Sequence, residues 1–176
     1  MKILAFGGST SSQSINRQLA QYVASRIPNA EVTALDLRDF DLPSYSMDEE
    51  EANGVPSIAK NFKGLIESHD GIVLSLAEHN GSYSAAFKNL YDWTSRIDTK
   101  VWAGKPMLLM ATSPGGRGGK TVMEAASATF PRMGAELKAT FSLPSFHENF
   151  EAGKGVVNEE LAAELDKAIK LFAKAF

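Results

Sequence analysis

The sequence predicts an α/β fold in which helices cover both faces of one parallel sheet. Five short apolar runs, typical of buried parallel strands, alternate with segments whose apolar residues recur at helical spacing. Such alternation favours three layers, helix–sheet–helix. Right-handed crossovers leave few topologies, and 2-1-3-4-5 is a common strand order for five strands. With 176 residues and 44% apolar content, we expect residues 1–176 to form one domain.

The first half of the chain is expected to hold three strands and two helices. The strands are Ile3–Phe6, Glu31–Leu37 and Gly71–Leu76. One helix carries apolar residues from Ile15 to Ile27 and stops at Pro28-Asn29, and another starts at Pro56, which suits a first helical turn. The stretch Arg38–Gly54 is polar, acidic and contains proline, so we expect a long surface loop there.

The second half completes the alternation. A helix that buries Phe87, Leu90, Tyr91 and Ile97 precedes the strand Pro106–Ala111. The following helix uses apolar residues from Val122 to Met133, and Leu137–Phe141 is a weaker fifth strand. Asn158 is expected to cap the last helix, because acidic residues follow it directly and lysines lie near the helix end.

Composition narrows the functional classes. A net charge of −3 provides no basic field for nucleic acid or an anionic membrane, and the absence of cysteine removes thiolate chemistry. No apolar run approaches the about 20 residues needed to cross a bilayer. The apolar start Met1–Phe6 is too short for a signal peptide, so we expect a cytoplasmic protein.

The loop after the first strand has the composition of an anion cradle. Glycines allow close backbone approach, and hydroxyls supplement the free N–H groups at a helix start. The candidate residues are Ser9, Ser11, Ser14, Ile15 and Asn16. The loop matches neither the Walker pattern nor the dinucleotide fingerprint. The alternative is a hydroxyl-rich loop with Ser14 as an ordinary helix cap.

Two further loops mix polar side chains with a flexible backbone, as the edge of a planar heterocycle requires. The loop after the third strand offers Glu78, His79, Asn80, Gly81 and Ser82, and the loop after the fourth offers Ser113, Gly115, Gly116 and Arg117. Taken singly, His79 is better explained as a solvent-exposed loop residue than as a ligand contact, and the alternative for Arg117 is a mobile turn. Because ligands bind at the carboxyl ends of parallel strands, we expect the three loops to share one site.

A hydrolase must be weighed beside this interpretation. Ser9 could act as a nucleophile with His147 as its base and Glu148 as orienter. However, adjacent residues of an extended segment point apart, and the Gly-x-Ser-x-Gly elbow is missing. We therefore treat a serine hydrolase as the weaker alternative.

Together the loops resemble the NAD(P)H-dependent FMN reductases, a flavodoxin-like family of flavin, quinone, azo-dye and chromate reductases. Gly8-Ser9, Ser14 and Asn16 match its first loop, which reads Gly-Ser-x-Arg-x-x-Ser-x-Asn. Its second loop, Pro-Glu-Tyr-Asn-Gly-Ser, is matched at Glu78 and Asn80–Ser82, with Lys88-Asn89 and Asp92-Trp93 beyond. Its third loop resembles Ser113–Gly116 with Gly118-Gly119. Two departures stand out: Ser11 replaces the arginine, and His79 replaces the tyrosine.

The resemblance implies bound FMN, with NADPH or NADH as hydride donor and a flavin, quinone, azo compound or metal oxyanion as acceptor. It implies that the first loop holds the phosphate and that the other two contact the ring. Ping-pong kinetics, no catalytic side chain, no metal site and a homodimer or homotetramer follow from the same resemblance. The rival is a flavodoxin-type electron carrier, but the first loop lacks the Thr/Ser-x-Thr-Gly-x-Thr pattern of carriers.

Overall fold

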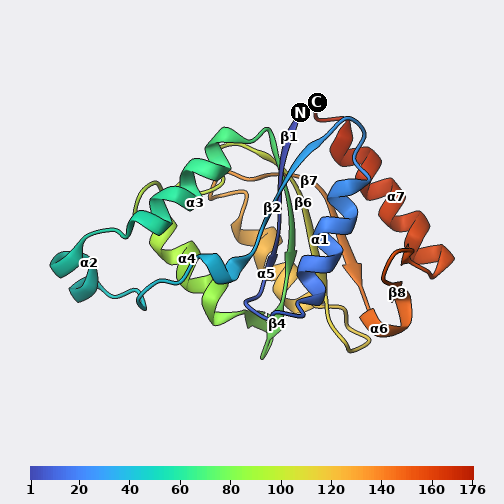
Figure 1. Ribbon diagram of the computed structural model, residues 1–176, viewed down its shortest axis with the longest axis horizontal. Helices are drawn as coiled ribbons and strands as arrows, with labels where there is room; N and C mark the ends of the chain where they lie inside the picture. Colours follow the sequence, from blue (N-terminus) through green and yellow to red (C-terminus); the bar gives the residue numbers. More distant parts are fainter.

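The computed structural model describes residues 1–176 and confirms the predicted sheet and its helical layers (Figure 1). Five parallel strands lie in the order β2-β1-β3-β6-β7, which is the expected 2-1-3-4-5 order of the five main strands. They are β1 (Lys2–Gly8), β2 (Glu31–Leu35), β3 (Gly71–Leu76), β6 (Pro106–Thr112) and β7 (Glu136–Leu143). Phe6 of β1, which lies between β2 and β3, is in register with both Leu35 and Leu74.

Helices cover both faces of this sheet. On one face lie α1 (Ile15–Ser25) and α7 (Glu159–Ala173), and on the other lie α3 (Ser57–Ser68), α4 (Ala85–Ser95) and α5 (Lys120–Thr129). Alternation along β1 serves both layers, since Ile3 and Ala5 pack toward α1 and α7 while Leu4 and Phe6 pack toward the other helices. The two apolar cores hold the strands rigid beneath the loops that follow them. No helix is long and apolar enough to cross a membrane.

The prediction of a long loop over Arg38–Gly54 is wrong. The segment contains most of the 3-10 turn η1 (Leu37–Asp39) and the helix α2 (Met47–Asn53). The Ser46 side chain caps α2 by accepting a hydrogen bond from the Glu49 N–H at 3.0 Å. No residue of α2 is buried, and the helix projects from the body of the molecule (Figure 1). Apolar periodicity could not reveal it, because it has no core-facing stripe.

Other elements also differ from those that the sequence predicts. The loop after β3 is a hairpin of β4 (Glu78–His79) and β5 (Ser82–Tyr83), not an open turn. The segment between β7 and α7 holds the short helix α6 (Phe146–Asn149) and a second hairpin of β8 (Phe150–Glu151) and β9 (Gly155–Val156). The second strand ends at Leu35 rather than at the predicted Leu37. Ile97 lies beyond α4 and is 38% exposed, so its predicted burial is wrong.

Candidate functional site

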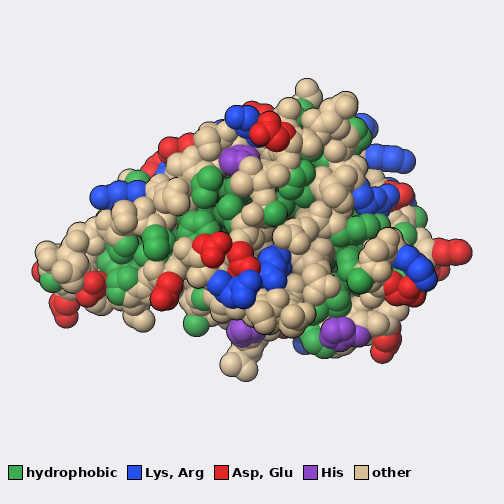
Figure 2. Space-filling view, in the orientation of Figure 1, with side chains coloured by type: hydrophobic (Ala, Val, Ile, Leu, Met, Phe, Trp, Pro, Cys, Tyr) green, Lys and Arg blue, Asp and Glu red, His purple; other side chains and the backbone are tan.

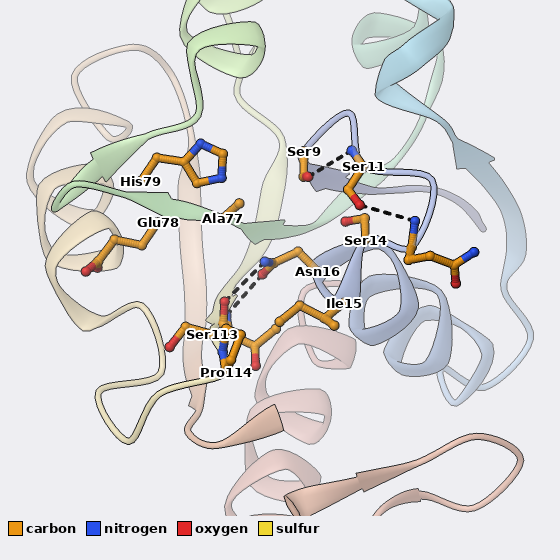
Figure 3. A pocket seen from close by; sticks show the side chains of 12 residues that line it. Ser9, Ser11, Ser14, Ile15, Asn16, Ala77, Glu78, His79, Ser113 and Pro114 are labelled. Carbon is orange, nitrogen blue, oxygen red and sulfur yellow. Dashed lines mark hydrogen bonds between the residues drawn. The ribbon is translucent and has the colours of Figure 1, made fainter. Parts of the chain in front are cut away.

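Three loops meet at the carboxyl ends of β1, β3 and β6 and form a pocket of about 230 Å³. Figure 3 shows His79 across this pocket from three serines of the first loop, with Asn16 between the two sides. Of the predicted site residues, it is lined by Ser9, Ser11, Ser14, Ile15, Asn16, Glu78, His79 and Ser113. Gln13, Ala77, Thr112 and Pro114 complete the wall and were not predicted.

Several hydrogen-bond donors of the β1–α1 loop have no acceptor within the protein. Ser9 Oγ accepts from the Ser11 N–H at 3.2 Å, and Ser11 Oγ accepts from the Gln13 N–H at 3.2 Å. Each hydroxyl therefore uses its oxygen as an acceptor and leaves its O–H free to donate. The N–H groups of Ile15 and Asn16, in the first turn of α1, also have no protein acceptor. The loop is a cluster of neutral donors suited to an anion.

Ser14 is both part of the pocket and the N-cap of α1. Its Oγ accepts from the Arg17 N–H at 3.1 Å, while its O–H has no acceptor in the protein. Ser14 is therefore a helix cap, as the alternative interpretation held, but capping leaves its O–H free to donate. Gly7 allows β1 and α1 to pack closely, because a Cβ at this position would overlap the Arg17 backbone.

Asn16 joins the strands beneath the pocket. Its Nδ2 donates to the Thr112 carbonyl oxygen at 3.1 Å, and its Oδ1 accepts from the Thr112 N–H at 3.0 Å and the Ser75 hydroxyl at 2.7 Å. The side chain is 3% exposed. It thus holds α1 against β3 and β6, while the backbone N–H of Asn16 has no protein acceptor.

The β4–β5 hairpin forms the second wall. Asn80 and Gly81 both have positive φ, 52° and 75°, as the two central residues of a type I′ turn require. Together with Ser82 they lie at the exposed tip of the hairpin and do not line the pocket. Glu78 Oε2 accepts from the Val122 N–H at 2.9 Å and so satisfies the start of α5. His79 is the wall residue that remains exposed.

The β6–α5 loop uses its four glycines in two different ways. Gly118 and Gly119 have positive φ, 59° and 73°, and a Cβ at either would collide with β7 or β6. At Gly115 and Gly116 an added Cβ would meet nothing within 4 Å, so packing does not require glycine there. Gly115 directly follows the lining residue Pro114, whereas Gly116 lines a separate pocket with Thr140 of β7 and Leu161 of α7. Arg117 turns away and donates to Thr121 Oγ1 at 3.0 Å.

No serine-hydrolase triad is assembled. Ser9 forms no hydrogen bond with any histidine, and His147 lies exposed on α6. His79 shares the pocket with Ser9, but the adjacent Glu78 is engaged by α5 rather than by the imidazole. The pocket therefore offers binding groups without an oriented nucleophile and base.

The free donors fit a phosphate group, and the open space at Gly115 allows close approach of a flat ring. A neighbouring charged group, Asp36 at the end of β2, is held ionised by hydrogen bonds from Arg38, which lower its pKa to about 2. The Arg17 guanidinium also contacts Asp36. The charges near the phosphate-facing loop are thus paired with each other, and none of the residues that line the pocket is Lys or Arg.

Comparison with known proteins agrees with this geometry. The family model for NADPH-dependent FMN reductase matches residues 1–148. A 2-hydroxy-1,4-benzoquinone reductase from a Burkholderia species is 37% identical over 120 residues, covering 67% of this chain but only 63% of that protein. An NADPH:quinone oxidoreductase from Arabidopsis thaliana is 27% identical over 183 residues, covering all of this chain and 91% of that protein.

Among solved structures, the flavoenzyme NAD(P)H:(acceptor) oxidoreductase FerB from Paracoccus denitrificans superposes with a TM-score of 0.77. It shares 26% sequence identity, with coverage of 98% of this chain and 95% of that one. The family match covers the three loops that line the pocket and the sheet that carries them. This chain belongs to the NADPH-dependent FMN reductase family.

Proposed function

We propose that this protein is an FMN-dependent NAD(P)H oxidoreductase that passes reducing equivalents from NADPH or NADH to a quinone, a flavin or a similar small oxidant. The observation that carries the proposal is the cluster of donors without protein acceptors at the start of α1. Family membership and the names of the quinone-reducing relatives support the reaction class and the acceptor.

The FMN phosphate lies against the β1–α1 loop in this proposal. The hydroxyls of Ser9, Ser11 and Ser14 donate to its oxygens, and the N–H groups of Ile15 and Asn16 complete the cradle. Hydrogen bonds to an ionised group are stronger than neutral ones, so phosphate contacts dominate affinity over ring contacts. Riboflavin, which lacks the phosphate, binds much more weakly as a consequence.

The flavin ring would be held by residues of the second and third loops. His79 faces it from the β4–β5 hairpin, and Asn80, Gly81 and Ser82 fix the hairpin's shape rather than line the pocket. Ser113 and the open backbone at Gly115 and Gly116 approach its polar end. Arg117 reaches the ring only if it releases Thr121. Glu78 positions the hairpin through its bond to α5.

Bound FMN would supply the redox chemistry that links a nicotinamide to an oxidant, so the protein would need no acid–base pair of its own. The residues of the protein would bind and orient FMN and its substrates. Donor and acceptor use the same open side of the pocket in turn, which predicts ping-pong kinetics. A single domain, residence in the cytoplasm and assembly into a homodimer or homotetramer complete the proposal.

Titration and turnover together test this function. Apoprotein should bind FMN far more tightly than riboflavin, and reconstituted protein should oxidise NADPH or NADH when 1,4-benzoquinone is present. Parallel lines in double-reciprocal plots are the expected pattern. FMN binding without nicotinamide turnover would favour an electron carrier, and equal affinity for FMN and riboflavin would remove the phosphate role of the β1–α1 loop.

A further inference from the structure

The β1–α1 loop lacks an arginine at Ser11, yet a guanidinium lies directly behind it. We infer that Arg17 supplies the positive charge that stabilises the FMN phosphate in this protein, an inference that rests on the proposed function. Arg17 does not line the pocket, so it acts through the loop rather than by direct contact. It is a positioning residue whose charge also reaches the ligand.

Three contacts place Arg17 against the loop. Its Nη2 donates to the Ser12 carbonyl oxygen at 2.6 Å, and its backbone N–H donates to Ser14 Oγ at 3.1 Å. Ser12 directly follows Ser11, whose hydroxyl lines the pocket. The third contact is the ion pair between Arg17 and Asp36 at the end of β2. Arg17 therefore binds the loop at two points, through its side chain and its backbone, while the ion pair with Asp36 fixes the guanidinium.

The charge of Arg17 is poorly screened where it sits. Its side chain is 17% exposed, compared with 49% for Arg38, the other arginine bound to Asp36. Charges that are partly buried interact over longer distances than exposed ones, because less water and salt intervene. Figure 2 shows acidic and basic side chains next to each other near the middle of this face, with other charged side chains toward its edges. Arg17 and Arg38 both pair with Asp36, whose single charge does not neutralise both guanidinium groups.

A charge-balancing role and a purely structural role predict different results. If Arg17 only supports the loop, its removal distorts the site, and a charge placed elsewhere cannot restore binding. If its charge matters, an arginine at Ser11 should compensate, because that residue lines the pocket. The affinity for riboflavin separates the two further, since riboflavin occupies the ring site but carries no phosphate.

The test is a set of FMN and riboflavin titrations on apoprotein, with unfolding by urea as a check of the fold. We expect Arg17→Gln to raise the Kd for FMN roughly tenfold and to flatten its dependence on salt, while the Kd for riboflavin changes less than about twofold. Ser11→Arg in the Arg17→Gln background should return the FMN Kd to within about threefold of wild type. Arg26→Gln is the matched control, because it removes the same charge from the far end of α1, where Arg26 pairs with Asp166.

Should Arg17→Gln fail to fold, Arg17→Lys retains the charge and is expected to keep most of the FMN affinity. Equal weakening of FMN and riboflavin without rescue by Ser11→Arg would overturn the inference, as would an unchanged FMN Kd in Arg17→Gln. Wild-type protein that binds no FMN would instead refute the proposed function itself, so the two failures are distinguishable.

Discussion

Replacing Asn16 by alanine is expected to cost more stability than almost any other polar substitution in this protein. The variant removes three hydrogen bonds that link α1 to Ser75 of β3 and Thr112 of β6, with lengths of 2.7, 3.0 and 3.1 Å. Both partners are buried, at 0% and 1% exposure, so water cannot replace the lost contacts. A typical hydrogen bond contributes about 1 kcal/mol net, and an unpaired buried group costs about 1–3 kcal/mol.

We therefore expect Asn16→Ala to lower the free energy of unfolding by about 3 kcal/mol or more. For a chain of this size that corresponds to a fall in Tm of roughly 6–12 °C. Urea unfolding followed by far-UV circular dichroism measures the loss, and an unchanged m-value shows that the unfolding transition is the same. The matched control is Ser75→Ala, which removes one of the three bonds together with its donor and should cost only about 0.5–1.5 kcal/mol.

A loss below about 1 kcal/mol in Asn16→Ala would refute this reasoning, since it would mean that the buried partners find other acceptors and donors. A double variant gives an independent check. Because Ser75 and Asn16 bond to each other, the effects of the two substitutions should not add, and simple additivity would show that the contact contributes nothing.

Three further predictions concern other parts of the structure. The buried Lys63 ammonium donates to two backbone carbonyl oxygens of the loop before β6. Lys63→Met should therefore destabilise the protein by about 1–3 kcal/mol in urea unfolding. Lys60→Met, on the exposed side of the same helix, should not. The ionised Asp36 stabilises the fold at pH values above its ordinary pKa of 3.8, and this contribution is lost as the pH falls toward about 2. In Asp36→Asn the free energy of unfolding should therefore depend less on pH over that range. An unchanged pH dependence would count against the ion pair. Gly118→Ala should lower Tm because of its positive φ and its contact with β7, while Gly115→Ala should leave Tm unchanged yet weaken FMN binding; the reverse pattern would place the ring elsewhere.

The parallel sheet could be predicted because its strands are nearly uniformly apolar and its helices carry clear apolar stripes. All six residues of β3 are buried, which is why the run Gly71–Leu76 was recognisable. In contrast, α2 buries nothing, so only its Ser46 cap and acidic first turn could have revealed it. The Asn80-Gly81 pair is a strong hairpin signal and is the local sequence feature that indicates β4 and β5.

The site was predicted at the level of loops but not of contacts. Strand ends converge in any parallel sheet, so Ser9, Glu78 and Ser113 could be expected to share a pocket. The particular roles depend on partners far away in the chain. Glu78 bonds to a residue 44 positions on, and Asn16 to one 96 positions on. No local pattern indicates such pairings, because they depend on how the sheet brings the loops together.

The central claim, that this protein itself carries hydride from a nicotinamide to bound FMN, is tested most directly by an anaerobic rapid-mixing experiment. FMN-reconstituted protein is mixed with NADPH, and separately with NADH, in the absence of any acceptor, and the visible absorbance of the flavin is followed. We expect rapid and complete bleaching with at least one of the two donors, followed by recovery of the absorbance when 1,4-benzoquinone is added. A flavin that binds tightly but keeps its absorbance with both donors would contradict the account and identify the protein as a carrier.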